Sequence, residues 1–518
     1  MPAQPTPIRN LHVFLAKEEY RGPEFLLREP DAYRHRIIST RDGFLGLLYI
    51  KPDNPHEPKW LRFFKGALDE PLPPLVASSV SAVLILECAG RTFLVTFGYG
   101  RSMIQDGVVE PRFGLKATLN AVDPDKLRSM DSKSFERIQR LSREQLSRDS
   151  GLNAFGLNVE QDLLAGVVGT PEDDSYGRRL VGRDALTTFV EANLEDLKGL
   201  LTRYLELSEQ DRYKQVFPWV DNIAEVSDSL TRKRLDNQLC RLIRRQDLAD
   251  IVLTPPDLLD WEELHHFAYR TSSNAAQHDE LAWDDYFREI RSADEVTPAT
   301  LMKDRVFCAL DDLGGKAAAW SLRRCIAGEL VYHGDRFVLS EGKWYRIAQD
   351  FADRVVAAVQ AMGPCAERLP AYAHTSEGAY NRAAAQGSGN RWALMDEKMI
   401  YTRRGKVEFC DLFSDQKRMI HAKRHASSAP LSHLFSQGVV SAGLFHGDAA
   451  FRRLVNDELP VSHRLSDPDA SIDPQAYEVA YVILGGTGRP IPFFSMVNLR
   501  NAADNLRRLN YNVSLTYV

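Results

Sequence analysis

A short segment near the C-terminal end of the chain is the feature that most restricts the fold. Arg418–Arg424 has the sequence Arg-Met-Ile-His-Ala-Lys-Arg. Side chains alternate between the two faces of a strand, so His421 and Lys423 would share one face, while Ile420 and Ala422 take the other. Lysine is rarely buried without a partner. The segment therefore predicts an interior strand whose polar face meets a ligand or an acidic group.

An acidic residue precedes this strand at a matching distance. We expect Lys406–Phe413 to form the preceding strand, because it follows the turn residues Arg404-Gly405. Asp411 and Lys423 are 12 residues apart, which suits neighbouring strands of a hairpin. A carboxylate can hold a divalent metal, and a cation can stabilise the charge that develops when a phosphodiester is cleaved. The pair is a candidate catalytic centre, although a purely structural ion pair would use the same residues.

The elements expected around these two strands follow a definite order. The spacing of apolar residues predicts helices at 350–362, 377–386, 431–444 and 498–509. It predicts strands at 392–401, 406–413, 418–424, 477–484 and 512–518. From residue 377 the order is thus αβββαβ followed by a further helix and strand, and the strands at 407–413 and 418–424 should be adjacent in a mixed sheet.

This order, with Asp411 and Lys423 on neighbouring strands, resembles the core of the PD-(D/E)xK nucleases, which have the restriction-endonuclease-like fold. In that family an Asp on the second core strand binds the metal, and an acidic residue and a Lys two positions apart lie on the third strand. The resemblance covers residues 351–518. It implies that Asp411 binds Mg²⁺ or Mn²⁺ and that Lys423 stabilises the transition state.

The sequence departs from the family pattern at one position, where His421 replaces the usual acidic residue. Histidine can bind a metal or act as a base, but it is a poorer Mg²⁺ ligand than a carboxylate. Glu408 or Glu377 would then supply the missing carboxylate, since some members of that family carry a Glu on the preceding helix. Gln437 resembles the helix Gln of some branches. A nuclease fold that has lost activity and is kept for binding remains an alternative.

Basic residues gather around the two strands, although the whole chain has a formal net charge of −6. A local excess of positive charge is typical of a surface that contacts phosphates. We expect nucleic acid as the partner, with DNA first and RNA as an alternative; a solvated hairpin rim would also account for the turn arginines. The residues expected to contact nucleic acid are Arg403, Arg404, Lys417, Arg418 and Arg424.

The rest of the chain predicts an α+β protein with several parts and no clustered catalytic residues. Residues 1–120 are expected to be rich in strands, 121–300 to be mainly helical, and 301–350 to form a connector before the module at 351–518. Within the helical part we expect a polar helix face along Pro124–Asp149 and an amphipathic helix at Asp184–Leu207. This N-terminal part would contribute recognition or regulation.

Cysteine usage and hydropathy bear on where the protein acts. The 6 cysteines are scattered and form no CxxC motif, which disfavours a zinc finger and fits a reducing compartment. No stretch of about 18 apolar residues is present, so we expect no transmembrane helix and no membrane partner. The expected localisation is the cytoplasm.

The whole chain is also similar to a bacterial family described as sporadically distributed. The matching stretches are Gly98–Arg101, Phe113–Lys116, Val407–Arg424, Leu431–Phe435 and Pro492–Ser495. Patchy distribution of this kind implies mobile elements and antiphage defence, with a companion defence protein or a homo-oligomer as a further partner. The hypothesis is therefore an antiviral protein with a metal-dependent nuclease domain that acts on DNA. The alternative is an inactive nuclease-fold module that binds DNA, a phage protein or a partner protein.

Overall fold

The structure is a computed structural model, and it describes residues 8–51, 80–134, 140–151, 154–155, 162–256, 266–271, 275–309, 316–402, 405–425, 428–485 and 491–518. The chain divides into two compact units. The first comprises residues 1–133 and 141–220, and the second comprises 134–140 and 221–518. Helices and strands are mixed in several sheets, as expected for an α+β protein.

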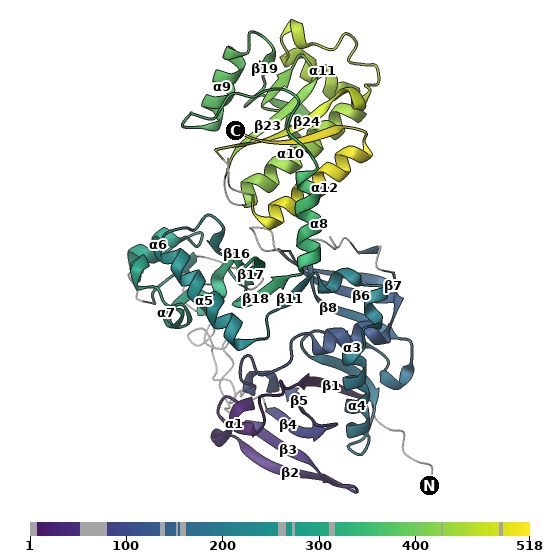
Figure 1. Cartoon of the computed structure of the whole chain (residues 1–518). Coiled ribbons are helices and arrows are strands. Elements are labelled where there is room, and N and C mark those ends of the chain that lie inside the picture. Colours follow the sequence, from purple (N-terminus) through teal and green to yellow (C-terminus); the bar gives the residue numbers. More distant parts are fainter. Residues whose placement is uncertain are drawn as a thin grey trace, which may run out of the picture. The chain divides into compact units, whose positions relative to one another are not determined.

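A ten-stranded sheet dominates the first unit (Figure 1). Its order is β2-β3-β4-β5-β1-β10-β9-β8-β6-β7. The strands are β1 (Ile8–Leu15), β2 (Arg34–Thr40), β3 (Gly43–Lys51), β4 (Ser81–Cys88), β5 (Arg91–Gly98), β6 (Val122–Ser134), β7 (Arg140–Ser150), β8 (Asp162–Pro171), β9 (Leu180–Gly182) and β10 (Leu186–Glu191). Helices α3 (Phe113–Ala121) and α4 (Leu197–Glu209) pack together and share one core with β1, β5 and β10. The expected strand-rich character of residues 1–120 is confirmed.

Two predictions for the region after residue 120 are wrong. The polar stretch expected as a helix face forms the strands β6 and β7, and the expected helix at Asp184–Leu207 is split into β10 and α4. Ion pairs within the sheet explain the first error. The Asp131 carboxylate of β6 accepts hydrogen bonds from Arg143 of β7, at 2.7 Å, and from Arg183. Charged residues that would suit a solvated helix are thus paired between strands.

The first part of the second unit contains two sheets and three helices. A five-stranded sheet has the order β11-β18-β17-β16-β12, and a three-stranded sheet has the order β13-β14-β15. The strands are β11 (Ile223–Glu225), β12 (Ile251–Leu253), β13 (His266–Ala268), β14 (Arg305–Ala309), β15 (Lys316–Ser321), β16 (Ile326–Tyr332), β17 (Asp335–Ser340) and β18 (Lys343–Ile347). The helices are α5 (Ser229–Arg244), α6 (Trp283–Glu289) and α7 (Pro298–Lys303).

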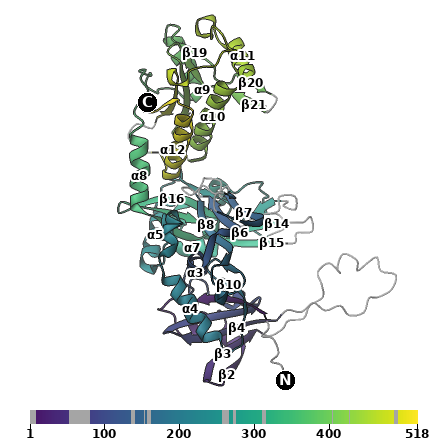
Figure 2. The same cartoon turned by 90° about the vertical axis from the view of Figure 1, so that its right-hand side faces the viewer.

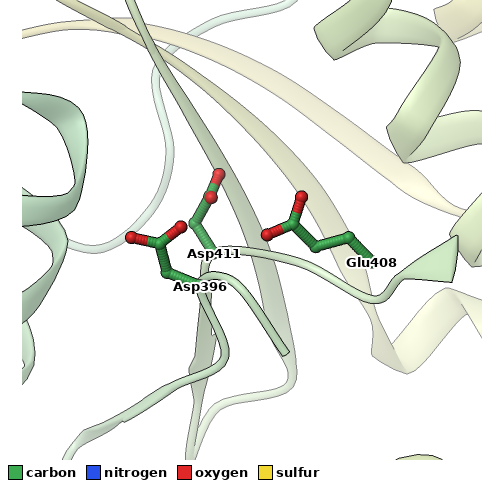
Figure 3. A group of neighbouring side chains, drawn as sticks. All are labelled: Asp396, Glu408 and Asp411. Carbon is green, nitrogen blue, oxygen red and sulfur yellow. The ribbon is translucent and has the colours of Figure 1, made fainter. Parts of the chain in front are cut away.

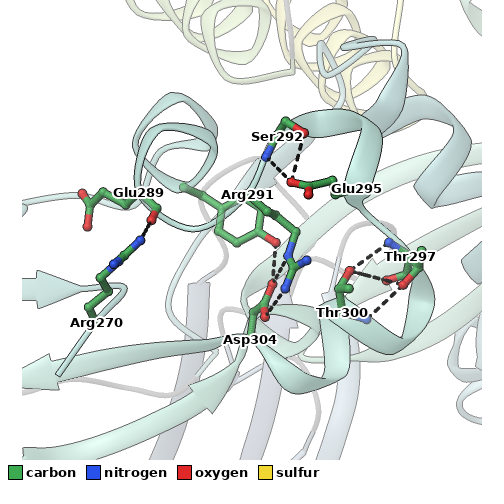
Figure 4. Close-up of polar contacts among 9 residues, drawn as sticks. Arg270, Glu289, Arg291, Ser292, Glu295, Thr297, Thr300 and Asp304 are labelled. Atoms are coloured by element: carbon green, nitrogen blue, oxygen red, sulfur yellow. Dashed lines mark hydrogen bonds and ion pairs between the residues drawn. The ribbon is translucent and has the colours of Figure 1, made fainter.

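A partly buried ion pair joins the segment after α6 to the junction of α7 and β14. Arg291 donates to both oxygens of Asp304, at 2.6 and 2.9 Å, and the Tyr286 hydroxyl donates to the same carboxylate at 2.7 Å (Figure 4). Thr297 caps α7 by accepting from the backbone N–H of Thr300. A two-pronged Arg–carboxylate contact has a fixed geometry, so this group holds the helical layer in one position. Its polar atoms are engaged with one another, which favours a structural role.

The C-terminal part of the second unit contains the sheet expected from the sequence. Its order is β19-β22-β23-β24-β25; β22 runs antiparallel to β23, and β23, β24 and β25 are parallel. The strands are β19 (Trp392–Leu394), β22 (Leu412–Ser414), β23 (Arg418–Arg424), β24 (Glu478–Leu484) and β25 (Asn512–Tyr517), with a separate hairpin of β20 (Met399–Thr402) and β21 (Gly405–Glu408). The helices are α8 (Gln349–Gln360), α9 (Glu377–Gly387), α10 (Ser428–Gly447), α11 (Ala449–Glu458) and α12 (Phe493–Arg508). The expected adjacency of the two central strands is confirmed in part. The expected strand at 406–413 is divided between β21 and β22, and of its described residues Leu412 and Phe413 pair with β23.

Helices cover this sheet on both sides (Figures 1 and 2). Ile420 and Ala422 of β23 share a core with Tyr380 of α9. On the opposite face, Tyr481 of β24 donates its hydroxyl to the carbonyl of Phe435 in α10 at 2.9 Å. Every residue of β24 is buried, as expected of a parallel strand covered on both faces.

Two sequence expectations concern the chain as a whole. All six cysteines are buried, free thiols. Among the described residues, the helices are too short or too polar to cross a membrane.

Candidate metal centre

Three carboxylates meet beside the ends of three strands. Asp396 follows β19, Glu408 ends β21, and Asp411 directly precedes β22. The backbone N–H groups of Met395 and Asp396 both donate to the carbonyl of Asp411, at 2.8 and 2.9 Å, which ties the two loops together. As a result, one carboxylate oxygen of each residue lies within 4.8 Å of the others, and all three residues are partly buried (Figure 3).

Each of the three carboxylates accepts a hydrogen bond from a neutral donor. Asn381 of α9 donates to Asp396 at 3.1 Å, and Gln437 of α10 donates to Glu408 at 3.1 Å. The backbone N–H of Ala422 donates to Asp411 at 2.7 Å. Helices from both faces of the sheet therefore hold the acidic group in place without neutralising it.

The positive charge near the three carboxylates does not balance their negative charge. Burial raises the pKa of Asp411 well above its ordinary value; the neighbouring carboxylates of Glu408 and Asp396 raise it further, while the Ala422 hydrogen bond and the Lys423 charge oppose them. Burial and Asp396 also raise the pKa of Glu408. A bound cation would relieve this repulsion, and three carboxylate oxygens are a suitable donor set for Mg²⁺ or Mn²⁺.

Lys423 and Glu377, both expected at the site, are paired with each other. The Lys423 ammonium lies 2.7 Å from a Glu377 oxygen, and the second Glu377 oxygen accepts from the Arg424 backbone N–H at 3.1 Å. Glu377 is therefore next to the lysine rather than among the three clustered carboxylates. Lys423 is still close enough to lower the pKa of both Asp411 and Glu408.

The structure places His421 apart from the acidic group. Its side chain is only 2% exposed, and its ring centroid lies 6.0 Å from that of Tyr481. Burial lowers the pKa of His421 to about 4, and Nε2 has no hydrogen-bond partner among the described residues. The imidazole is thus held neutral in the core between β23 and α10.

The three described residues among those expected to contact nucleic acid are not brought together as one surface. Lys417 lies over the Tyr477 ring at 5.2 Å, and Arg418 pairs with Glu478 at 2.9 Å, both at the start of β23. Arg424 is exposed at the other end of the strand, beside Lys423. The positions of Arg403 and Arg404 lie outside the described residues.

Asp396 is the site residue that sequence reasoning missed. The segment Trp392–Tyr401 was expected to be one strand, but it breaks into β19 and β20 around a turn where Glu397 has a φ of 65°. The polar run Asp396-Glu397-Lys398 within an apolar stretch was the available signal. Such a run interrupts a strand pattern and frequently marks a turn.

The fold and this site define an α+β protein with a carboxylate group beside a mixed sheet. The chain belongs to a family of unknown function (DUF6119), whose profile matches residues 11–518. No match was found among curated proteins or among solved structures.

Proposed function

We propose that the C-terminal part of the chain is a metal-dependent nuclease that cleaves DNA. The observation that carries this proposal is the convergence of Asp396, Glu408 and Asp411, with oxygens within 4.8 Å of one another, close to the Lys423 ammonium. Phosphodiester hydrolysis with a divalent metal needs carboxylates that hold the metal and a cation that stabilises the developing charge. This group supplies both at the ends of central strands.

Each residue then has a defined task. Asp396, Glu408 and Asp411 would hold Mg²⁺ or Mn²⁺, which when bound neutralises phosphate charge and lowers the pKa of water. Lys423 stabilises the negative charge that develops on the phosphate, and Glu377 positions the lysine through their 2.7 Å contact. Gln437 orients Glu408 by its hydrogen bond. In this proposal His421 supports the strand from the core and takes no direct part.

An inactive module that binds DNA or a protein is the second candidate function. The Lys423–Glu377 contact favours it, because an ion pair engages the one lysine that the family pattern requires for chemistry. In either form, we propose a role in antiphage defence, with a companion protein or a second copy of the chain as a partner. This role rests on the family resemblance of the sequence.

Cleavage assays with a charge-removing variant test the proposal. The full-length protein is incubated with linear and circular DNA, and with RNA, in the presence of Mg²⁺, Mn²⁺ or EDTA. Asp411→Asn should reduce cleavage by about 10²–10³-fold. The matched control is Asp415→Asn, which changes an exposed Asp in the turn after β22 and should leave cleavage unchanged.

Metal binding gives a second readout that does not depend on finding the right substrate. Titration calorimetry with Mn²⁺ should detect a site in the wild type and in Asp415→Asn, and a weakened site in Asp411→Asn. If the wild type neither binds Mn²⁺ nor cleaves any of these substrates, the nuclease proposal is wrong. If it binds DNA without metal and without cleavage, the binding module is the better description.

A further inference from the structure

An open pocket of about 820 Å³ lies between the β20–β21 hairpin and the junction of α10 and α11. Figure 2 shows these elements side by side, and α10 contacts β21 while α11 contacts β20. The residues that matter for its chemistry are Tyr401, Thr402, Gly443, Leu444, Asp448 and Phe451.

Glycines in α10 keep one wall of the pocket open. A Cβ added to Gly443 or Gly447 would meet nothing within 4 Å, so packing does not require glycine at either position. Gly438 in the same helix is different, because a Cβ there would lie 2.4 Å from the Tyr481 hydroxyl. Glycine lowers helix stability relative to alanine. Both glycines line the pocket, so a larger side chain at either position would extend into it.

The pocket combines an aromatic ring with a hydrogen-bond acceptor. Tyr401 is 74% exposed, whereas its neighbour Ile400 is buried. Asp448 caps α11 by accepting from the backbone N–H groups of Ala450 and Phe451. Both of these bonds go to Oδ1, which leaves Oδ2 as an acceptor within the described part of the chain. An aromatic ring and a carboxylate oxygen that line one pocket suit a planar ligand that carries N–H donors.

The pocket is within reach of the carboxylates along two elements. Glu408 pairs with Met399 across the hairpin, and Tyr401 lies two residues further along β20, about 7 Å away. Gln437, which binds Glu408, precedes Gly443 by six residues of α10, about 9 Å along the helix axis. A chain molecule bound at the carboxylates could therefore place one of its units in the pocket.

Positive charge accompanies this route. Lys406 is exposed and pairs with Tyr401 across the hairpin. A phosphate group passing along the hairpin would thus meet the basic residue Lys406 across from Tyr401.

We propose that this pocket receives an unpaired nucleobase of the strand that the acidic group cleaves. The substrate is then single-stranded or locally unpaired nucleic acid. This inference rests on the proposed nuclease function. A base can stack on Tyr401 and donate from its amino group to Asp448, as in proteins that bind single strands through aromatic platforms. A base inside a duplex is stacked and paired, and it cannot enter a pocket without leaving the helix.

Binding measurements in EDTA test the pocket without requiring cleavage. The full-length protein is titrated into a fluorescent single-stranded oligonucleotide and into the same sequence as a duplex. Tyr401→Ala should weaken single-strand binding about tenfold. The matched control is Tyr99→Ala, which removes a tyrosine that is 71% exposed and lies in the first unit, and it should change nothing.

A pocket-filling variant gives independent support. Gly443→Leu places an apolar side chain in open space and should weaken single-strand binding to a similar extent. Gly199→Leu is its control, because Gly199 also lies in a helix with nothing within 4 Å of an added Cβ. Thermal melting of each variant confirms that it is folded, and equal binding by all four variants and the wild type would overturn the proposal.

Oligonucleotides with one abasic position separate the pocket from the rest of the site. Moving the abasic position along the strand should reveal one place where loss of the base weakens binding and where Tyr401→Ala has no further effect. Competition by free nucleoside monophosphates at the affinity of the oligonucleotide would show that the ligand is a free nucleotide, against the proposal. If the protein cleaves its substrate and no pocket variant changes binding or cleavage, the pocket proposal is wrong and the nuclease proposal stands. If the pocket variants weaken binding but the wild type cleaves nothing in Mg²⁺ or Mn²⁺, the pocket proposal stands and the nuclease proposal is wrong.

Discussion

The Asp411 carboxylate is held where its negative charge is unfavourable. It is packed beside Glu408 and Asp396 and is supported by one backbone hydrogen bond from Ala422. A carboxyl group whose pKa is higher in the folded than in the unfolded protein stabilises the fold when protonated, and this contribution is lost as the pH rises through the folded-state value. The site therefore opposes folding at neutral pH, as expected of a group arranged for a ligand.

Removing this charge should stabilise the protein while it reduces cleavage. Asp411→Asn keeps the shape and an oxygen that can accept from Ala422, and we expect the free energy of unfolding to rise by roughly 0.5–2 kcal/mol at pH 7 without metal. The gain should grow with pH, because Asn does not ionise. Thermal melting against pH measures it. Added Mn²⁺ should raise the melting temperature of the wild type more than that of the variant, and equal shifts would argue against a metal at Asp411.

His421 should make the stability of the fold depend on pH with a sign opposite to that of Asp411. Its pKa is lowered from 6.5 to about 4 by burial, so the unfolded chain binds a proton that the folded protein excludes. This contribution to stability is complete above about pH 6.5 and is lost as the pH falls toward 4, by about 3 kcal/mol in total.

The variant His421→Phe isolates this effect. Phenylalanine keeps a ring beside Tyr481 and removes a buried nitrogen that lacks a partner among the described residues. We expect the variant to be close to the wild type at neutral pH and more stable than it near pH 4, as measured by denaturant unfolding at several pH values. If the variant retains metal-dependent cleavage, the expectation that His421 is a ligand or a base is wrong. If the difference in stability between His421→Phe and the wild type did not change with pH, the conclusion that the imidazole is buried and neutral would be wrong.

At the scale of elements, helix α10 offers two glycines with opposite roles. Gly438→Ala would force its Cβ against the Tyr481 hydroxyl, and we expect a loss of about 1–3 kcal/mol from overpacking. Gly443→Ala meets nothing within 4 Å and should stabilise the helix by about 0.5–1 kcal/mol. Denaturant unfolding of both variants measures the contrast. Similar effects of the two substitutions would mean that α10 does not pack closely on β24 at Gly438.

The elements of the C-terminal sheet could be predicted because their patterns are strong. The segment 418–424 alternates and is bounded by polar residues, and it forms β23 with the expected ends. The segments 122–134 and 140–150 carry few apolar residues, so no period marks them as strands. Their few apolar side chains pack in a core with residues distant in sequence, such as Leu127 with Leu115 and Phe217. Asp131 also pairs with Arg143 and Arg183. Local sequence does not contain that information.

The same distinction applies to the site. Asp411 and Lys423 could be predicted because they lie on or beside strands whose spacing fixes which residues are neighbours. Asp396 could not, because a turn brings it to Asp411 through backbone hydrogen bonds. The pleat of β23 does not bring His421 to the carboxylates, since its ring packs toward Tyr481 and α10. Spacing along the chain predicts neighbours within a sheet but not where a loop turns.

At the scale of the second unit, a carboxylate joins its two parts. Glu329 of β16 accepts the backbone N–H groups of Phe493 and Phe494, at 2.7 and 3.0 Å, and so caps the N-terminus of α12 from another sheet. Helix α12 is joined in turn to α10 by a 2.6 Å hydrogen bond from Asn498 to Ser432. The sheet that contains β16 is therefore linked, through α12, to α10, the helix that carries Gln437. A negative charge at a helix N-terminus also interacts favourably with the helix dipole.

Truncating this side chain should loosen the junction. Glu329→Ala leaves two N–H groups without their acceptor, and we expect a loss of about 1–3 kcal/mol together with faster hydrogen exchange at the start of α12. Glu329→Gln is the control, since its single oxygen still accepts one bond. Burial raises the pKa of Glu329 to about 7, so the protonated form stabilises the wild type at low pH and this contribution is lost as the pH rises through about 7. As the pH rises from about 5 to 8, the free energy of unfolding of the Gln variant should therefore increase relative to that of the wild type. A constant difference across that range, or wild-type exchange in the Ala variant, would show that Glu329 does not hold the two parts together.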